Sequence, residues 1–275
     1  MSRSFSGGDE FGHAPLLRLL NVGRQFVPPR WRPGLRNFLF SLHSLTFARP
    51  SGVRLRVADD TDWAIYTELF RKGEYDIAIN RALDSAGPGR FIVVDLGANV
   101  GFFTLRLIDA VRSRGNRSLD TAITAIEGSP TRVADFRSRV LGDNGLAAQV
   151  HVTGGLVGAP SGVGTLHEMR SHGDSSLFKR AGSSGQAVQV EFVDVSRLLA
   201  SEPVIHLLKC DIEGAELQFI RNFPDVLQKT RVAVFELHDE LCDTGACRRL
   251  LREYGFSQET AIRSAGPYSL HCVWR

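Results

Sequence analysis

The chain has 275 residues, of which 43% are hydrophobic and 23% are charged, and its formal net charge is +3. This composition is typical of a globular protein and excludes collagen-like, disulfide-rich and disordered chains. The charge is too small to indicate a nucleic-acid partner, and none is expected. The four cysteines lack the paired spacing of a zinc site, which favours free thiols in a reducing, cytoplasmic compartment.

The first part of the chain differs from the rest. Residues 1–13 are rich in glycine and serine, which predicts a disordered tail. Residues 14–58 carry leucines at helical spacing, which predicts a helical N-terminal extension. Its arginines offer peripheral contact with an anionic membrane surface, although a cap packed on the main domain is favoured. They are Arg18, Arg24, Arg30, Arg32 and Arg36.

Residues 59–275 are expected to form one α/β domain. From Arg90 onward, apolar strands alternate with amphipathic helices, a pattern typical of a parallel sheet covered on both faces. The predicted core strands lie near residues 91–94, 121–126, 149–152, 204–208 and 232–235. An antiparallel pair is predicted at 162–166 and 187–193, and a last strand at 269–274 at or near the sheet edge.

A glycine loop follows the first of these strands. Gly97 and Gly101 lack side chains, so a cofactor can approach the backbone closely there. The next helix presents free N–H groups suited to a methionine carboxylate, and Asp95 is expected to accept from the methionine ammonium. The loop, which also contains Ala98 and Asn99, therefore predicts S-adenosylmethionine as the cofactor.

An acid at the end of the second strand supports this prediction. Glu127, followed by Gly128 and Ser129, is placed to bind both ribose hydroxyls of the cofactor. A nicotinamide-dependent Rossmann oxidoreductase is an alternative, but it normally shows G-x-G-x-x-G, and Asn99 stands in the place of one glycine. A cofactor-fold domain that serves only as a binding module is another alternative.

Together with the loop, the segment Leu208–Glu216 (LKCDIEGAE) makes the chain resemble the FkbM family of methyltransferases. The resemblance extends from about Asp59 to the C-terminus. It implies a class I (Rossmann-like) methyltransferase fold with a mostly parallel seven-stranded sheet and helices on both faces. It also implies O-methylation, typically of a sugar hydroxyl in a glycolipid, polysaccharide or glycosylated natural product. Polyketide, protein and nucleic-acid acceptors are the alternatives.

Candidate catalytic side chains follow two neighbouring strands. Lys209, Asp211 and Glu213 alternate at the carboxyl end of one, and Glu236 and His238 repeat the alternation on the next. We expect Asp211 and His238 to flank the acceptor hydroxyl, one as general base, with Lys209 offsetting negative charge. Alternatively, Asp211, Glu213 and either His238 or Glu236 hold a divalent cation such as Mg²⁺.

Three further expectations concern the surroundings of this site. Glu213 or Glu216 has the alternative role of capping the helix that begins near Gly214. Glu74, Tyr75 and Asp76 are expected to cover the mouth of the cofactor or acceptor site, with simple packing as the alternative for Tyr75. No acid follows the third strand, so backbone groups near Thr153 are predicted to contact the adenine.

Overall fold

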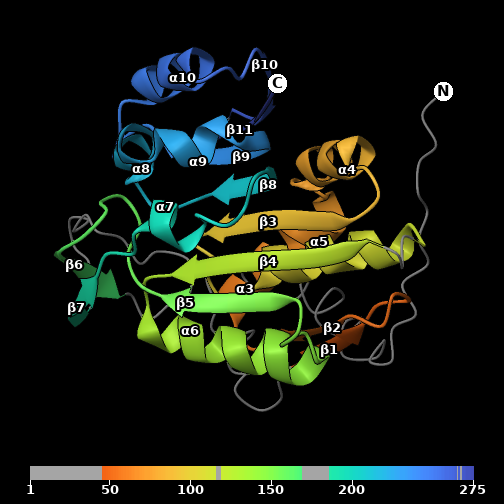
Figure 1. Ribbon diagram of the computed structural model, residues 1–275. Helices are drawn as coiled ribbons and strands as arrows, with labels where there is room; N and C mark the ends of the chain where they lie inside the picture. The colour runs from red at the N-terminus through yellow and green to blue at the C-terminus, as the bar shows by residue number, and fades with distance from the viewer. Residues whose placement is uncertain (1–44, 116–118, 169–185, 265, 267) are drawn as a thin grey trace.

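The computed structural model describes residues 45–115, 119–168, 186–264, 266 and 268–275. Its centre is one seven-stranded sheet with helices on both faces (Figure 1). The strands are β3 (Arg90–Leu96), β4 (Asp120–Glu127), β5 (Val150–Gly154), β8 (Ile205–Cys210), β9 (Thr230–His238), β10 (Gln258–Arg263) and β11 (Tyr268–Trp274).

The strand order is β10-β11-β9-β8-β3-β4-β5. Strands β9, β8, β3, β4 and β5 run parallel, and β11 is antiparallel to both of its neighbours. This confirms the mostly parallel seven-stranded sheet expected from the sequence, with the last strand one position from the edge. The edge strand β10 was not predicted, because none of its residues is buried and the sequence shows no apolar face there.

Of the described helices, two precede β3 and six lie in the connections between later strands. They are α3 (Asp60–Tyr66), α4 (Asp76–Ser85), α5 (Phe102–Ser113), α6 (Pro130–Phe136), α7 (Val195–Leu198), α8 (Glu216–Asn222), α9 (Pro224–Gln228) and α10 (Thr244–Glu253). Two of them continue into π-helical turns, α3 into η2 (Thr67–Lys72) and α6 into η3 (Arg137–Gly142). None of the described helices is long and apolar enough to cross a bilayer.

Alternation along β3 divides the core into two layers. Val93 packs in one buried cluster with residues of α4 and α5, whereas Val94 and Leu96 pack in the other with residues of α8 and α9. Successive side chains of a strand point to opposite faces, so a continuously apolar strand needs helices on both sides. The carboxyl end of β3 is thereby held rigidly at the centre of the sheet.

Two short hairpins flank the sheet. The strands β6 (Val163–Glu168) and β7 (Gln186–Glu191) pair antiparallel, which confirms the prediction for this interval. The other hairpin, β1 (Leu45–Ala48) with β2 (Arg54–Val57), corrects the expectation that residues 14–58 are helical throughout. The predicted tail and the predicted helices before Leu45 lie outside the described residues.

The β1–β2 hairpin has a clear physical basis. Leu55 and Val57 are fully buried, whereas the intervening Arg56 is not, so the segment follows the period of a strand. Asn144 pairs with the hairpin backbone, accepting from Arg54 N at 2.7 Å and donating to Arg54 O at 2.9 Å. The hairpin therefore packs as part of the main domain.

We predict that Gly97→Ala destabilises the fold more than glycine replacement at another left-handed position. Gly97 has φ 73°, and a Cβ atom there would lie 1.7 Å from the Asp211 carbonyl oxygen. Gly145 has φ 65° with nothing within 4 Å of its Cβ position, so Gly145→Ala is the matched control. We expect the control to cost roughly 1–2 kcal/mol and Gly97→Ala more than about 3 kcal/mol. Urea unfolding measures both, and equal losses would contradict the prediction.

Candidate active site

Two adjoining cavities open where β3, β8 and β9 end. The larger has a volume of about 480 Å³ and the smaller about 60 Å³. Gly97, Asn99, Asp211 and Glu213 line both of them, so the glycine loop and the loop after β8 separate one cavity from the other. The cavities lie at the carboxyl ends of parallel strands, where open α/β sheets bind their ligands.

The glycine loop has the expected strand, turn and helix arrangement. The amides of Gly97 and Ala98 both donate to the Ile126 carbonyl at 3.0 Å, which ties the loop to β4. Gly101 has φ 94° and precedes α5, whose N-terminus has no side-chain cap. A Cβ atom on Gly101 would lie 2.3 Å from Val140, so this glycine is also required by the packing of the protein itself.

Glu127 joins the two loops that surround the smaller cavity. Its Oε2 accepts from Asn99 N and its Oε1 from Ser129 N, both at 2.8 Å. The residue is only 6% exposed, yet it lines the smaller cavity together with Gly128. A carboxylate has about four acceptor positions, so two backbone bonds leave capacity for two hydroxyl donors. Ser129 is buried, and its hydroxyl donates to Glu168.

Asp95 occupies a different place from the one expected. It is fully buried and lines neither cavity, and its Oδ2 accepts from the Thr104 hydroxyl at 2.9 Å. Lys209 Nζ lies 3.6 Å from Asp95 Oδ1 and donates to the Gly97 carbonyl at 2.6 Å. Asp95 thus acts beneath the glycine loop, where it positions Lys209.

Lys209 also contacts Asp211, with Nζ 3.3 Å from Oδ2. Burial by itself would lower the pKa of Lys209, but Asp211 and Asp95 outweigh it and hold that pKa above its ordinary value. The ammonium therefore stays charged and fixes one edge of Asp211. Asp211 is 25% exposed to the larger cavity, as expected for a residue that meets a ligand.

Glu213 and Glu216 have different roles at the turn before α8. Glu216 is fully buried, and its Oε1 accepts from the amides of Ile212 and Gly214 at 3.1 Å. Glu213 has a left-handed backbone, φ 53°, and its Oε2 lies 3.5 Å from His238 Nε2. Glu216 therefore stabilises the turn, and Glu213 joins the cluster in the cavity.

Crowding of acidic groups changes the pKa values at the end of β9. Burial and then the nearby Asp211 raise the pKa of Glu236 to about 8. Burial alone would lower the pKa of His238, but Glu216, Asp211 and Glu213 raise it to about 9. At neutral pH the imidazole is thus protonated and serves as a donor, which disfavours His238 as the general base.

The outer wall of the larger cavity combines aromatic rings with further carboxylates. The Tyr75 hydroxyl donates to Glu236 Oε2 at 3.3 Å, and Glu74 lines the same wall, as expected. Arg263 Nη1 lies 3.1 Å from Glu74 Oε2, and its guanidinium lies over the Tyr268 ring at 4.1 Å. Sequence reasoning missed Arg263, because the strand β10 that carries it was not predicted, and Tyr268, because the predicted last strand began one residue later.

The far end of the smaller cavity differs slightly from the expectation for the adenine. The chain just after β5, residues 155–157, lines it rather than Thr153. Leu166 of β6 completes an apolar side, and a Cβ atom on Gly128 would lie 2.9 Å from Leu156. Leu156, Val157 and Leu166 thus give this cavity an apolar side.

Comparison with known proteins gives one family match and one curated relative. The family model for the methyltransferase FkbM domain matches residues 95–257. Methyltransferase 1 from Beauveria bassiana (strain ARSEF 2860) is 26% identical over 213 residues, covering 70% of this chain and 80% of that protein.

Solved structures show similarity at low sequence identity. The FkbM methyltransferase from Methylobacillus flagellatus KT has 15% identity and a TM-score of 0.46, covering 79% of this chain and 56% of that chain. This chain thus spans little more than half the length of that protein. An O-methyltransferase from Bacillus cereus, solved in complex with SAH, has 12% identity and a TM-score of 0.41, covering 74% and 81%.

We predict that Lys209→Met destabilises the protein by roughly 3–5 kcal/mol, because it leaves the fully buried Asp95 carboxylate without its cation. The double variant Lys209→Met/Asp95→Asn removes the stranded charge and should regain part of this loss. Urea unfolding of both variants measures the effect. A double variant less stable than Lys209→Met alone would contradict the proposed pairing.

Proposed function

The chain belongs to the FkbM methyltransferase family, and on that premise we propose that it transfers a methyl group from S-adenosylmethionine to a sugar hydroxyl. The observation that carries the proposal is Glu127, which fixes the loops around the smaller cavity directly beside the acidic end of β8. A methyl donor and an acceptor would therefore meet at Asp211, which lines both cavities.

The residues around the smaller cavity fit this cofactor. Glu127 would accept from the ribose hydroxyls, and the slot formed by Gly128, Leu156 and Leu166 would hold the adenine. The methionine carboxylate would lie at the N-terminus of α5, beyond Ala98 and Asn99, where unpaired amides and the helix dipole favour an anion. The sulfonium end would then face the larger cavity.

Bound S-adenosylmethionine supplies an electrophilic methyl carbon. The acceptor oxygen forms a bond to that carbon, the carbon–sulfur bond breaks with its electrons passing to sulfur, and the hydroxyl proton must leave. We propose that the carboxylate of Asp211 takes this proton, while Lys209 holds the carboxylate in place. The main contribution of the protein is alignment of the two reactants in a cavity that excludes water.

A sugar acceptor is supported by the walls of the larger cavity. The side chains of Glu68 and Glu74 supply hydrogen-bond acceptors, and Ala64, Ile65 and Leu241 supply apolar surface. Hydroxyl groups and the C–H faces of a pyranose ring match these two kinds of surface. The carrier of the sugar, a glycolipid, a polysaccharide or a natural product, belongs to the same proposal.

The proposal also includes contact with a membrane and a divalent cation. The predicted arginine-rich helices before Leu45 would bring the enzyme to a membrane that displays a lipid-linked acceptor. A divalent cation would assist in activating the hydroxyl.

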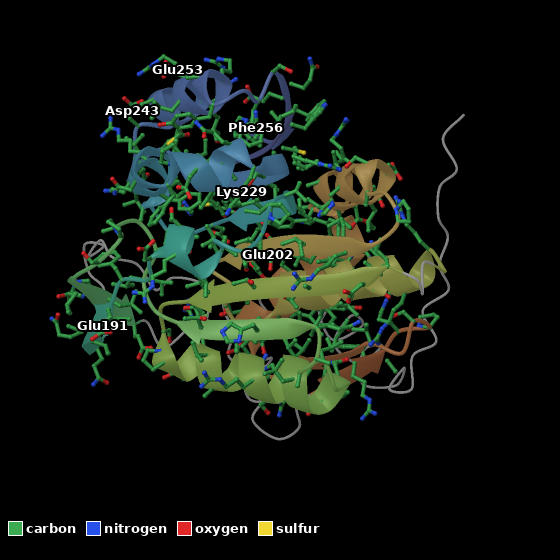
Figure 2. All side chains as sticks on the ribbon, viewed as in Figure 1. Glu191, Glu202, Lys229, Asp243, Glu253 and Phe256 are labelled. Carbon is green, nitrogen blue, oxygen red and sulfur yellow. The ribbon has the colours of Figure 1, made fainter. Side chains whose placement is uncertain are left out.

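We predict that Glu127→Gln weakens S-adenosylmethionine binding about tenfold to a hundredfold, because a neutral amide loses the charge-assisted bonds to the ribose. Isothermal titration measures the affinity, and thermal unfolding checks the fold. Glu253→Gln is the control, since Glu253 is exposed on α10 at the top of the molecule (Figure 2). An unchanged affinity of Glu127→Gln for S-adenosylmethionine would contradict the proposed role of Glu127 in cofactor binding.

We predict that Asp211→Asn lowers turnover about a hundredfold or more while the affinity for S-adenosylmethionine stays within about threefold. Release of S-adenosylhomocysteine with a panel of free and lipid-linked glycans gives the rate, and Glu253→Gln again serves as control. A variant that turns over at the wild-type rate would exclude Asp211 from catalysis.

A further inference from the structure

Three side chains from two neighbouring strands converge at the floor of the larger cavity. Asp211 follows β8, Glu213 lies two residues further on, and His238 ends β9. One potential ligand atom from each lies within 4.8 Å of the other two. We propose that these three side chains bind a divalent transition-metal ion such as Mn²⁺.

The orientation of His238 favours this site independently of the acidic residues. His238 is only 5% exposed, and its Nε2 faces Glu213 Oε2 at 3.5 Å and Glu236 Oε1 at 3.9 Å. Among the described residues, Nδ1 of His238 has no hydrogen bond of normal geometry, and the nearest acidic oxygen to it is Glu216 Oε1 at 3.5 Å. The buried ring is therefore aimed into the cluster by one nitrogen.

The other nitrogen of His238 meets a fixed carboxylate. Its Nδ1 lies 3.5 Å from Glu216 Oε1, and that oxygen is held by the amides of Ile212 and Gly214. Metal-binding histidines commonly donate the second ring N–H to a carboxylate, which fixes the tautomer and the ring orientation. Glu216, His238 and the facing carboxylates reproduce this arrangement when the metal ion takes the place of the proton on Nε2 of His238.

Charge and distance are also suitable for a cation. Asp211 and Glu213 supply two carboxylates here, and the Lys209 ammonium, which lies 3.3 Å from Asp211 Oδ2, is shared with Asp95 and the Gly97 carbonyl. Metal–ligand bonds of roughly 2.0–2.2 Å place two ligands at most about 4.4 Å apart. Small rotations of Asp211 and Glu213, which are 25% and 21% exposed, would close the remaining gap.

The ligand types select the ion. Mg²⁺ and Ca²⁺ prefer oxygen ligands only, whereas one imidazole with two carboxylates suits a first-row transition metal. The proposed site thus replaces the Mg²⁺ of the sequence-based expectation with an Mn²⁺-type ion. Its catalytic consequence rests on the proposed function: a bound ion would make a nearby acceptor hydroxyl more acidic, and the carboxylates at this end of the sheet would be placed to take its proton.

Binding of Mn²⁺ itself tests the site without any acceptor. The full chain is dialysed against a chelator and titrated with Mn²⁺, and electron paramagnetic resonance counts the free ion. We expect one bound ion per chain in the wild type and an affinity lower by about tenfold or more in Glu213→Gln and His238→Gln. Glu240→Gln is the matched control, since Glu240 is exposed and lines the same cavity outside the cluster.

The outcomes separate this proposal from the proposed function. Absence of Mn²⁺ binding, wild-type affinity in Glu213→Gln, or an equal loss in Glu240→Gln would each overturn the site. Displacement of Mn²⁺ by an equal concentration of Mg²⁺ would overturn the choice of ion. Titration of the same samples with S-adenosylmethionine reports on the proposed function separately, because the cofactor contacts assigned to Glu127 do not involve the cluster.

Discussion

The buried ammonium of Lys209 is the interaction on which the rest of the site depends. It lies between β3 and β8, donates to the Gly97 carbonyl, and pairs with Asp95 below and Asp211 above. A single cation thereby fixes the glycine loop and the first acidic side chain of the larger cavity relative to each other. Its burial strengthens these interactions, because the surrounding core excludes water that would screen them.

A second constraint comes from the backbone around that ammonium. The Asp211 carbonyl passes so close to Gly97 that a side chain at Gly97 has no room. Glu127 then ties the other side of the loop to the start of α6 through Asn99 and Ser129. The glycine loop is held by both neighbouring strands, so its conformation is fixed before a ligand binds. Binding therefore costs less free energy for ordering the loop.

The sequence predicts the central sheet, the glycine loop and Glu127 well, because buried strands and tight turns leave strong local patterns. It places the candidate residues on the correct strand ends but cannot distinguish Glu213 from Glu216. That choice depends on the left-handed backbone at Glu213, which turns its side chain toward His238, and no local pattern specifies it.

Other features escape sequence reasoning for related physical reasons. The hairpin at residues 45–57 follows a helix-like run of leucines, and its burial depends on distant partners such as Asn144. Arg263 contacts Glu74 from an edge strand without a buried face, so this contact exists only in the folded sheet. Contacts between segments far apart in sequence decide both cases.

The carboxylates of the site have different roles, because different hydrogen-bond donors surround them. Backbone amides surround Glu127 and Glu216, and such groups hold a carboxylate in place without competing for a proton. Asp95 is enclosed by Lys209 and Thr104. Asp211, Glu213 and Glu236 instead face the cavity and meet mainly side chains that can move or exchange protons. Burial and then the nearby Asp211 raise the pKa of Glu236 to about 8, so this carboxyl holds a proton more readily than an exposed one. Catalysis is therefore expected at the carboxylates that face the cavity rather than at those that backbone amides already hold in place.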